Sequence, residues 1–194
     1  RPEEVKSRSV NLIGLLRAGP DLRELVRILD LIDVNVNAVL TAGTTIEDLN
    51  CLGSAALNIV LCEPAGRAAG ELLERISGTP FIIADVPIGN AATVRFLDRV
   101  STSLGLGRYV ARDPEVDNAC YTALANRRVA IVSGPTRAIS MATFFVDLGL
   151  SPSLIVVDFD SDTLTRLKDL VDPECEILIE PKQEEILEVL ESCR

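Results

Sequence analysis

One cysteine stands out as a residue able to do chemistry. Cys62 ends the apolar run 57–62 and directly precedes Glu63 and Pro64, which begin a helical pattern. A helix N-terminus favours the thiolate form of a cysteine, and a thiolate is both a nucleophile and a metal ligand. Because the sequence contains no histidine, a Cys–His catalytic pair cannot form within it. Cys62 is therefore a candidate metal or cofactor ligand, and a buried structural cysteine is the alternative.

The second candidate is the turn at 133–137 (SGPTR), which joins an apolar run to a helical pattern. Amide groups at the start of a helix can bind an anion, and Gly134 would let a ligand approach the backbone closely. Arg137 would add a positive charge in the first helical turn. The turn matches neither G-x-G-x-x-G nor G-x-x-x-x-G-K-[ST], so the nucleotide-binding fingerprints are absent. An ordinary strand-to-helix turn is the alternative.

Other side chains offer weaker signals. Asp85, Asp158 and Asp160 follow predicted strands and could act as acids or bases, but helix capping is the favoured role for Asp160 and for Asp162. The cysteines contain no C-x-x-C pair, and their odd number argues against a disulfide framework. We expect most of them to be small buried hydrophobic residues. They stand at positions 51, 62, 120, 175 and 193.

Composition and charge exclude several classes of protein. The 194 residues are 47% hydrophobic and 25% charged, which is typical of a folded domain and not of a disordered chain. The net charge is −10 without a basic stripe, so nucleic-acid binding is not expected. The segment 151–194 holds 12 acidic and 4 basic residues, which predicts a solvated acidic face; a surface that guides a basic partner is the alternative.

The sequence gives no sign of a membrane segment or a secretion signal. No apolar run approaches 18 residues. The chain begins at Arg1 without an initiator Met or a signal-peptide pattern, which predicts a cytoplasmic protein and a fragment of a longer chain.

Apolar runs alternate with amphipathic helical patterns along almost the whole chain. Continuous Val, Ile and Leu runs joined by helices predict parallel sheets covered on both faces. The predicted strands cover 9–15, 34–40, 57–62, 81–84, 128–132, 154–159 and 176–179. Thr44 and Glu47 have the spacing of a capping box, which predicts a short helix after the second strand.

These elements predict an α/β protein with two Rossmann-like lobes. The first lobe covers 1–107, a linker covers 108–126, and a second, partial lobe covers 127–194. The second lobe has only three predicted strands, so we expect the natural protein to continue beyond Arg194. Ligands of such sheets bind beyond the carboxyl ends of the strands, where Gly14, Cys62 and Gly134 are expected.

Four short stretches of the sequence point to a family when they are taken in order. They are 10–14 (VNLIG), 19–22 (GPDL), 57–62 (LNIVLC) and 78–80 (GTP). Together they resemble the nitrogenase component 1 family, which includes the nitrogenase subunits, their cofactor-assembly scaffold and the tetrapyrrole reductases. The resemblance covers nearly the whole chain, as the later α/β part of a longer protein.

The resemblance implies roles for three residues. In the nitrogenase α subunit and its scaffold relative, the cysteine that matches Cys62 ligates the catalytic metal cluster, and the turn that matches Gly134 and Arg137 contacts that cluster. This sequence departs from the pattern, because Pro135 replaces a second glycine and the cofactor-ligating histidine has no counterpart. A nitrogenase-like reductase or scaffold therefore fits better than nitrogen fixation itself.

By the same resemblance, the whole protein is an oxidoreductase that accepts electrons from an ATP-dependent iron–sulfur reductase and passes them to a bound substrate or cofactor. It would assemble with a homologous subunit. The cluster would sit between Cys62 and Arg137, which are expected to face each other across a crevice. One thiolate does not hold a cluster, so the isolated fragment is expected to bind none tightly and to be inactive.

Two readings from other classes stay open. The chain could be a non-catalytic module whose two lobes close on a small molecule or a metallocofactor. The number of upstream cysteines in the full reading frame would distinguish this module from a redox enzyme. A sugar-nucleotide enzyme of similar two-lobed layout is a third possibility, disfavoured by the missing histidine and the missing phosphate-binding signature.

Overall fold

The computed structural model describes residues 5–15, 18–111 and 127–192. The chain forms two compact units. The first unit comprises Arg1–Asp85 and Thr93–Arg112, and the second comprises Val86–Ala92 and Asp113–Arg194. Most of the predicted linker 108–126 lies outside the described residues, and the predicted domain boundaries remain a prediction. Each unit is an α/β structure with a parallel sheet, as the sequence predicts.

The first unit is built on a parallel sheet with the strand order β2-β1-β3-β4. Its elements, in chain order, are β1 (Lys6–Ile13), α1 (Pro20–Asp30), β2 (Asn35–Leu40), α2 (Ile46–Asn50), the 3₁₀ turn η1 (Leu52–Ser54), β3 (Ala55–Val60), α3 (Glu63–Ser77), β4 (Phe81–Ile83) and α4 (Asn90–Ser103). Three of the four strands begin within two residues of their predicted starts, and β1 begins three residues early.

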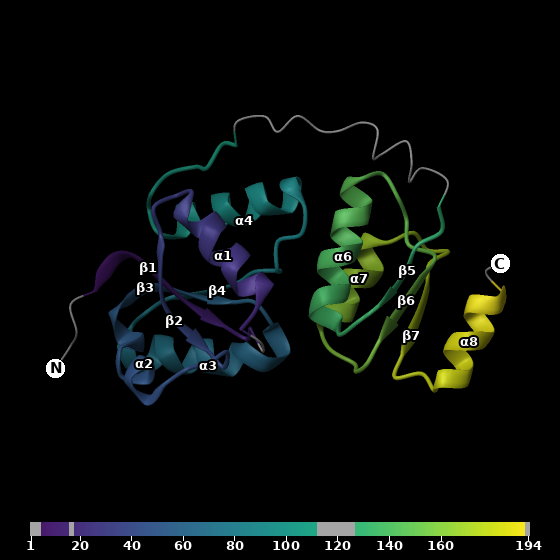
Figure 1. Cartoon of the computed structure of the whole chain (residues 1–194), viewed down its shortest axis with the longest axis horizontal. Helices are drawn as coiled ribbons and strands as arrows, with labels where there is room; N and C mark the ends of the chain where they lie inside the picture. Colours follow the sequence, from purple (N-terminus) through teal and green to yellow (C-terminus); the bar gives the residue numbers. More distant parts are fainter. Residues whose placement is uncertain (1–4, 16–17, 112–126, 193–194) are drawn as a thin grey trace. The chain divides into compact units, whose positions relative to one another are not determined.

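Helices cover both faces of this sheet. Figure 1 shows α1 and α4 on one face and α2 and α3 on the other. This arrangement follows from right-handed crossovers, because the chain leaves β1 in one direction to reach β2 and moves in the opposite direction from β3 to β4. Residues of β1 therefore face apolar neighbours on both sides: Leu12 and Ile13 are buried on opposite faces.

Two glycines let α3 approach the sheet closely. A Cβ atom at Gly66 would lie 2.9 Å from Val60 Cγ1 and 3.0 Å from Ile13 Cγ2. A Cβ atom at Gly70 would lie 3.0 Å from Phe81 Cδ2. These separations are shorter than ordinary carbon–carbon contacts of about 3.5–4.0 Å, so neither position accepts a side chain without displacement. The N-terminal half of α3 is thereby fixed against β1 and β3.

Three asparagines on adjacent strands form a buried polar row, which we call the asparagine ladder: Asn37, Asn11 and Asn58. Asn11 Nδ2 donates to Asn58 Oδ1 at 2.8 Å and to the Leu52 carbonyl at 2.9 Å. Asn37 Nδ2 donates to Asn11 Oδ1 at 2.9 Å, and Asn58 Nδ2 donates to the Thr79 carbonyl at 3.2 Å. Asn11 and Asn58 are fully buried. The ladder ties β2, β1 and β3 to η1, which precedes β3, and to the loop that precedes β4.

The short helix α2 begins one residue later than its capping signal predicts. Thr45 is the N-cap: its hydroxyl accepts a hydrogen bond from the Asp48 amide, and Asp48 Oδ2 accepts one from the Thr45 amide at 2.8 Å. The predicted pair of Thr44 and Glu47 is therefore wrong by one position. The Thr44 hydroxyl instead accepts from the Thr41 amide at 2.9 Å, because it closes the turn that follows β2.

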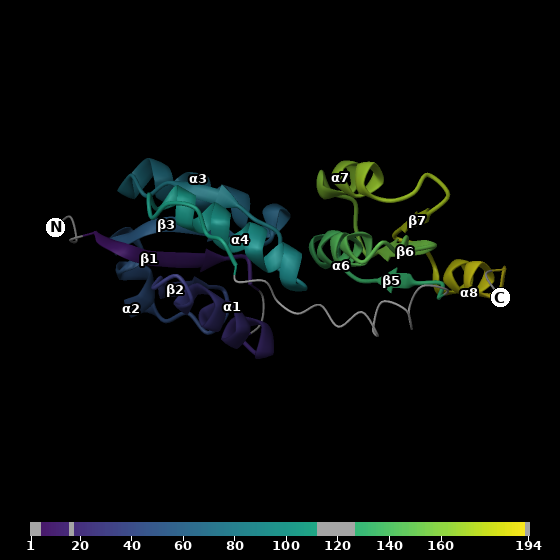
Figure 2. The ribbon, with the colours of Figure 1, turned by 90° about the horizontal axis from the view of Figure 1, so that it is seen from above.

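The second unit holds a three-stranded parallel sheet of order β5-β6-β7. Its elements are β5 (Ala130–Val132), α6 (Pro135–Asp147), β6 (Leu154–Val157), α7 (Thr163–Leu170), β7 (Glu176–Ile179) and α8 (Gln183–Ser192). Figures 1 and 2 show α6 and α7 together on one side of this sheet and α8 on the other. The core lies between the two paired helices and the strands, around Ile155, Val157 and Leu167.

The segment Val86–Ala92, which covers the end of the connection from β4 and the first residues of α4, belongs to the second unit. Gly89 has a left-handed backbone (φ +80°), and a Cβ atom there would come within 2.5 Å of Phe144 Cδ2 on α6. Only glycine fits this contact.

A further correction concerns Asp162, which stands at the N-cap of α7 but makes no capping hydrogen bond with its side chain.

Candidate functional site

The carboxyl edge of the first sheet contains a change of chain direction between β1 and β3. The helix that follows β1 lies on one face of the sheet and the helix that follows β3 lies on the other (Figure 1). In open parallel sheets, ligands bind outside the carboxyl ends of the strands at such a switch point. Gly14 follows β1 and Cys62 follows β3, so both residues lie at this point.

Cys62 is the N-cap residue of α3 and is half-buried. Its extended backbone (φ −130°, ψ 102°) turns the strand into the helix, and Pro64 occupies the first helical turn, where proline costs no hydrogen bond. The Cys62 carbonyl accepts from the Gly66 amide at 2.8 Å. Immediately before it, the Leu61 amide donates to the Ile13 carbonyl at 2.8 Å. The cysteine is thus anchored on both sides.

Gly14 is in direct contact with Cys62. Gly14 has φ +85°, a left-handed conformation that favours glycine. A Cβ atom built there would lie 2.9 Å from both the Cβ and the backbone nitrogen of Cys62. The sequence places both residues at one sheet edge, but their contact depends on β1 and β3 being neighbours, which the sequence pattern does not reveal.

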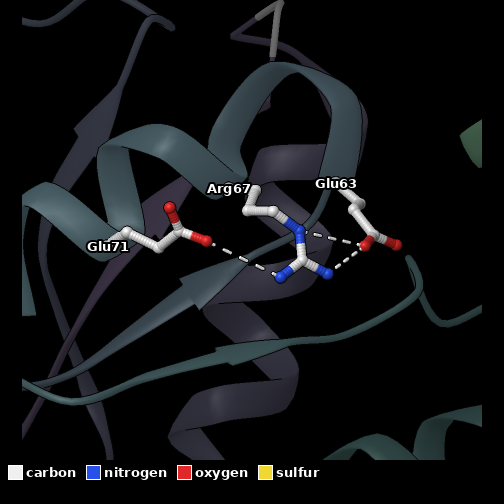
Figure 3. Close-up of polar contacts among 3 residues, drawn as sticks. All are labelled: Glu63, Arg67 and Glu71. Carbon is white, nitrogen blue, oxygen red and sulfur yellow. Dashed lines mark hydrogen bonds and ion pairs between the residues drawn. The ribbon is translucent and has the colours of Figure 1, made fainter. Parts of the chain in front are cut away.

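A charged row on α3 begins at the residue after Cys62. Arg67 contacts the Glu63 carboxylate through two of its nitrogens, with Nε at 3.2 Å, and its third nitrogen lies 3.7 Å from Glu71 Oε1 (Figure 3). The hydrogen bond with Glu63 is the main cause that raises the pKa of Arg67 above its ordinary value. The cation offsets the negative charge of Glu63, the residue that follows Cys62 in the sequence. Sequence reasoning missed Arg67, although the i, i+4 spacing of Glu63, Arg67 and Glu71 signals it.

The predicted turn of the second unit joins β5 to α6. Gly134 is the N-cap of α6, and Pro135 is the first helical residue. A Cβ atom at Gly134 would lie 3.4 Å from Asp158 Oδ1, so the glycine allows the carboxylate to approach the turn. Arg137 is exposed in the first turn of α6, and its amide donates to the Gly134 carbonyl at 3.0 Å.

A cavity of about 540 Å³ opens at the carboxyl edge of the second sheet. Its polar lining residues are Ser133, Gly134, Asp158 and Glu180, and its apolar ones come from β5, β6 and the start of α8. Arg137 is not among the described residues that line it. The polar groups are a hydroxyl and two carboxylates, which accept hydrogen bonds and suit a neutral or positively charged ligand.

The predicted partnership of Cys62 and Arg137 joins residues of different units. Cys62 belongs to the first unit and Arg137 to the second. The prediction that the two face each other across a crevice therefore stays a prediction, and so do the ligand roles of Cys62, Gly134 and Arg137.

Within the described ranges, no group of three or more His, Cys, Asp or Glu side chains is arranged to hold a metal ion. Cys62 would supply one thiolate ligand. Cys51 is exposed and Cys62 and Cys175 are half-buried, so the expectation that most of the five cysteines are buried is wrong. Cys175 is half-buried against the core of the second unit, and desolvation, followed by the nearby charge of Asp172, raises the pKa of its thiol. Cys120 and Cys193 lie outside the described residues.

Comparison with known protein families identifies the family of this chain. The family model for nitrogenase component 1 type oxidoreductases matches residues 1–194. The chain belongs to this family. The resemblance predicted from the short stretches around Gly14 and Cys62 is therefore confirmed.

Family members with similar sequences come from two groups. One subunit of the light-independent protochlorophyllide reductase of Methylobacterium sp. (strain 4-46) is 34% identical over 146 residues, which cover 70% of this chain and 29% of the relative. The nitrogenase iron-iron protein beta chain of Rhodobacter capsulatus is 29% identical over 181 residues, covering 80% and 39% respectively. This chain thus spans well under half of these two family members.

A solved family structure shares the fold. The structure described as nitrogenase Cp1 at pH 6.5 aligns with a TM-score of 0.73 at 20% identity, over 97% of this chain and 47% of that one. The likeness confirms the α/β fold with parallel sheets. In the part of the present chain that the structure describes, no helix is both long and apolar enough to cross a membrane.

Proposed function

We propose that this chain is part of the catalytic component of a nitrogenase-like oxidoreductase. The whole protein would accept electrons from an ATP-dependent iron–sulfur reductase and pass them to a bound substrate or cofactor, in an assembly with a homologous component 1 subunit in the cytoplasm. Family membership over the whole chain supports this proposal. The observation that links this proposal to a particular residue is the position of Cys62 at the switch point of the first sheet.

Cys62 would contribute one thiolate to an iron–sulfur or related cluster. Thiolates are preferred ligands of such clusters, and the cysteine is anchored by backbone hydrogen bonds before and after it. A cluster supplies one-electron transfer when it is bound. The other ligands would come from outside the described residues, since these hold no complete metal site. Gly134 would let the second unit approach the group, and Arg137 would offset its negative charge.

The decisive experiment is anaerobic reconstitution of the complete protein with iron and sulfide. Native protein is compared with Cys62→Ala by iron content, absorption and electron paramagnetic resonance. We expect the variant to lose iron and the cluster spectrum, while the control Cys51→Ala, at an exposed cysteine, keeps both. Equal iron and spectra in native and Cys62→Ala protein would remove Cys62 from the site.

A second candidate function is a small-molecule-binding module, which the cavity of the second unit favours. Its volume of about 540 Å³ lies within the range of roughly 300–1,000 Å³ typical of ligand pockets. Under this alternative, the complete protein takes up no iron, and Asp158→Asn alters the binding of a small molecule. Cluster formation that depends on Cys62 would decide in favour of the oxidoreductase.

A further inference from the structure

We propose that Gly14 is the positioning residue of Cys62: the absence of a side chain at position 14 fixes where the thiol stands at the switch point. The consequence of this inference for metal binding rests on the proposed function, in which Cys62 is a ligand. Its structural basis is independent of that function. It is the contact between the end of β1 and the residue that follows β3.

The contact leaves no room for a methyl group. A Cβ atom at Gly14 would lie 2.9 Å from Cys62 Cβ, 2.9 Å from Cys62 N and 3.2 Å from Cys62 O. Two of these three atoms belong to the backbone, so a change of side-chain rotamer does not relieve the overlap. Ordinary contact between nonbonded carbon atoms begins near 3.5 Å, so residue 62 would have to move by about 0.5 Å.

Backbone hydrogen bonds on both sides of Cys62 restrain this movement. The Leu61 amide is bonded to the Ile13 carbonyl at 2.8 Å, and the Cys62 carbonyl is bonded to the Gly66 amide at 2.8 Å. Both partners belong to elements that are fixed in the core. A side chain at position 14 therefore distorts the peptide between these two bonds, which is the part of the chain that carries the sulfur.

The size of this displacement matters for a ligand. Metal–ligand distances in proteins lie within about 0.2 Å of their typical values, whereas relief of the overlap moves residue 62 by about 0.5 Å. Family members in which position 14 carries a side chain would therefore need a different backbone path after β3. In this chain, the glycine sets the specificity of the position for a well-placed thiolate.

Gly43 provides a matched control. It also has a left-handed backbone (φ +77°), but a Cβ atom there would have nothing within 4 Å. Gly43→Ala therefore reports the cost of a side chain in the left-handed region alone. Any effect of Gly14→Ala beyond that of Gly43→Ala comes from the contact with Cys62.

The test uses the complete, metal-free protein and site-resolved alkylation by iodoacetamide, followed by mass spectrometry. Cys51, which is exposed, is the internal reference. We expect Gly14→Ala to change the alkylation rate of Cys62 relative to Cys51 by about five-fold or more, because alkylation depends on the surroundings of the displaced thiol, and Gly43→Ala to leave the ratio unchanged. After reconstitution, Gly14→Ala is expected to lose iron to the level of Cys62→Ala.

The outcomes separate the two proposals. If Gly14→Ala and Gly43→Ala give the same alkylation ratio, the positioning role is overturned whatever the iron content. If the ratio changes but Cys62→Ala retains its iron, the proposed function fails and the positioning role stands. Should Gly14→Ala not fold under conditions in which Gly43→Ala does, the contact with residue 62, and not the left-handed backbone, is the cause, which supports the proposal. If both variants fail to fold, the left-handed backbone alone accounts for the loss and the positioning role is refuted.

Discussion

The asparagine ladder allows a quantitative test of what holds the first sheet together. Replacing Asn11 by leucine keeps the side-chain size but removes three hydrogen bonds inside the protein. Asn58 Oδ1 loses its donor among the described residues, and the Leu52 carbonyl and Asn37 Nδ2 each lose one of their partners. Leaving a buried acceptor unpaired costs about 1–3 kcal/mol, and each other lost bond costs about 0.5–1.5 kcal/mol. We expect Asn11→Leu to lower the free energy of unfolding by about 3 kcal/mol.

Urea unfolding followed by far-ultraviolet circular dichroism measures this change, since the chain has no tryptophan. At a slope of about 2 kcal/mol per molar urea, the midpoint should fall by about 1.5 M. Because the chain has two units, hydrogen exchange measured by mass spectrometry then localises the loss to β1, β2 and β3. Asn35→Leu, at an exposed position of β2, is the control and should stay within about 0.5 kcal/mol of the native protein.

The double variant Asn11→Leu/Asn58→Leu gives the sharpest refutation. Because the second substitution removes the unpaired acceptor left by the first, the double variant should lose less stability than the sum of the two single variants, by about 1–3 kcal/mol. Strict additivity would show that the bond of 2.8 Å between the two side chains contributes nothing. A loss below about 1 kcal/mol for Asn11→Leu alone would refute the ladder as a stabilising element.

Three further predictions follow from the described contacts. Gly70→Ala should lower the free energy of unfolding by about 1 kcal/mol in urea titrations, because the overlap with Phe81 outweighs the gain in helix propensity. Hydrogen bonds from Thr45 lower the pKa of Asp48, so the cap of α2 is stable above the ordinary pKa of the carboxyl and is lost as pH falls through the lowered value. The protection factors of the α2 amides, which are exchange rates corrected for the intrinsic dependence on pH, check this when they are measured against pH. Burial raises the pKa of the Cys175 thiol, so its alkylation should become appreciable only at a more alkaline pH than is usual for cysteine.

Each of these predictions has a control on the same element or of the same type. Ala68 lies on the exposed face of α3, and Ala68→Gly should lower stability by about 1 kcal/mol through helix propensity alone. Asp48→Asn should make the protection factors of the α2 amides independent of pH in the acid range; a persisting acid transition in these factors would contradict the assignment to Asp48. Alkylation of the exposed Cys51 provides the reference rate, and equal pH profiles for both thiols would contradict the prediction for Cys175.

The local pattern of the sequence predicts most of the fold, because strand runs and helix caps are properties of neighbouring residues. Pro64 at the start of a helix and the apolar run before it are enough to place Cys62 at an N-cap. The capping signal at Thr44 is off by one residue, since Thr45 with Asp48 satisfies the same spacing and the structure uses Thr44 to close a turn.

The contacts of the site depend on strand order, which no local pattern contains. The close approach of Gly14 to Cys62 exists only because β1 and β3 are neighbours. The ladder has the same origin: Asn11 and Asn58 lie in separate apolar runs, and nothing in either run indicates that the two polar side chains pair. Arg67 is different, because its two carboxylate partners are one helical turn away on the same helix and could have been found from the sequence.

The packing of Val86–Ala92 with the second unit has a consequence for dividing this protein into pieces. The chain passes from one unit to the other after Asp85, returns before Thr93, and passes again after Arg112. A single cut in the last of these passages therefore produces no fragment that contains the whole second unit. A C-terminal piece expressed by itself would present Phe144 without Gly89 against it, so a linear truncation is a poor substitute for the intact chain, whereas co-expression of both pieces restores the missing segment.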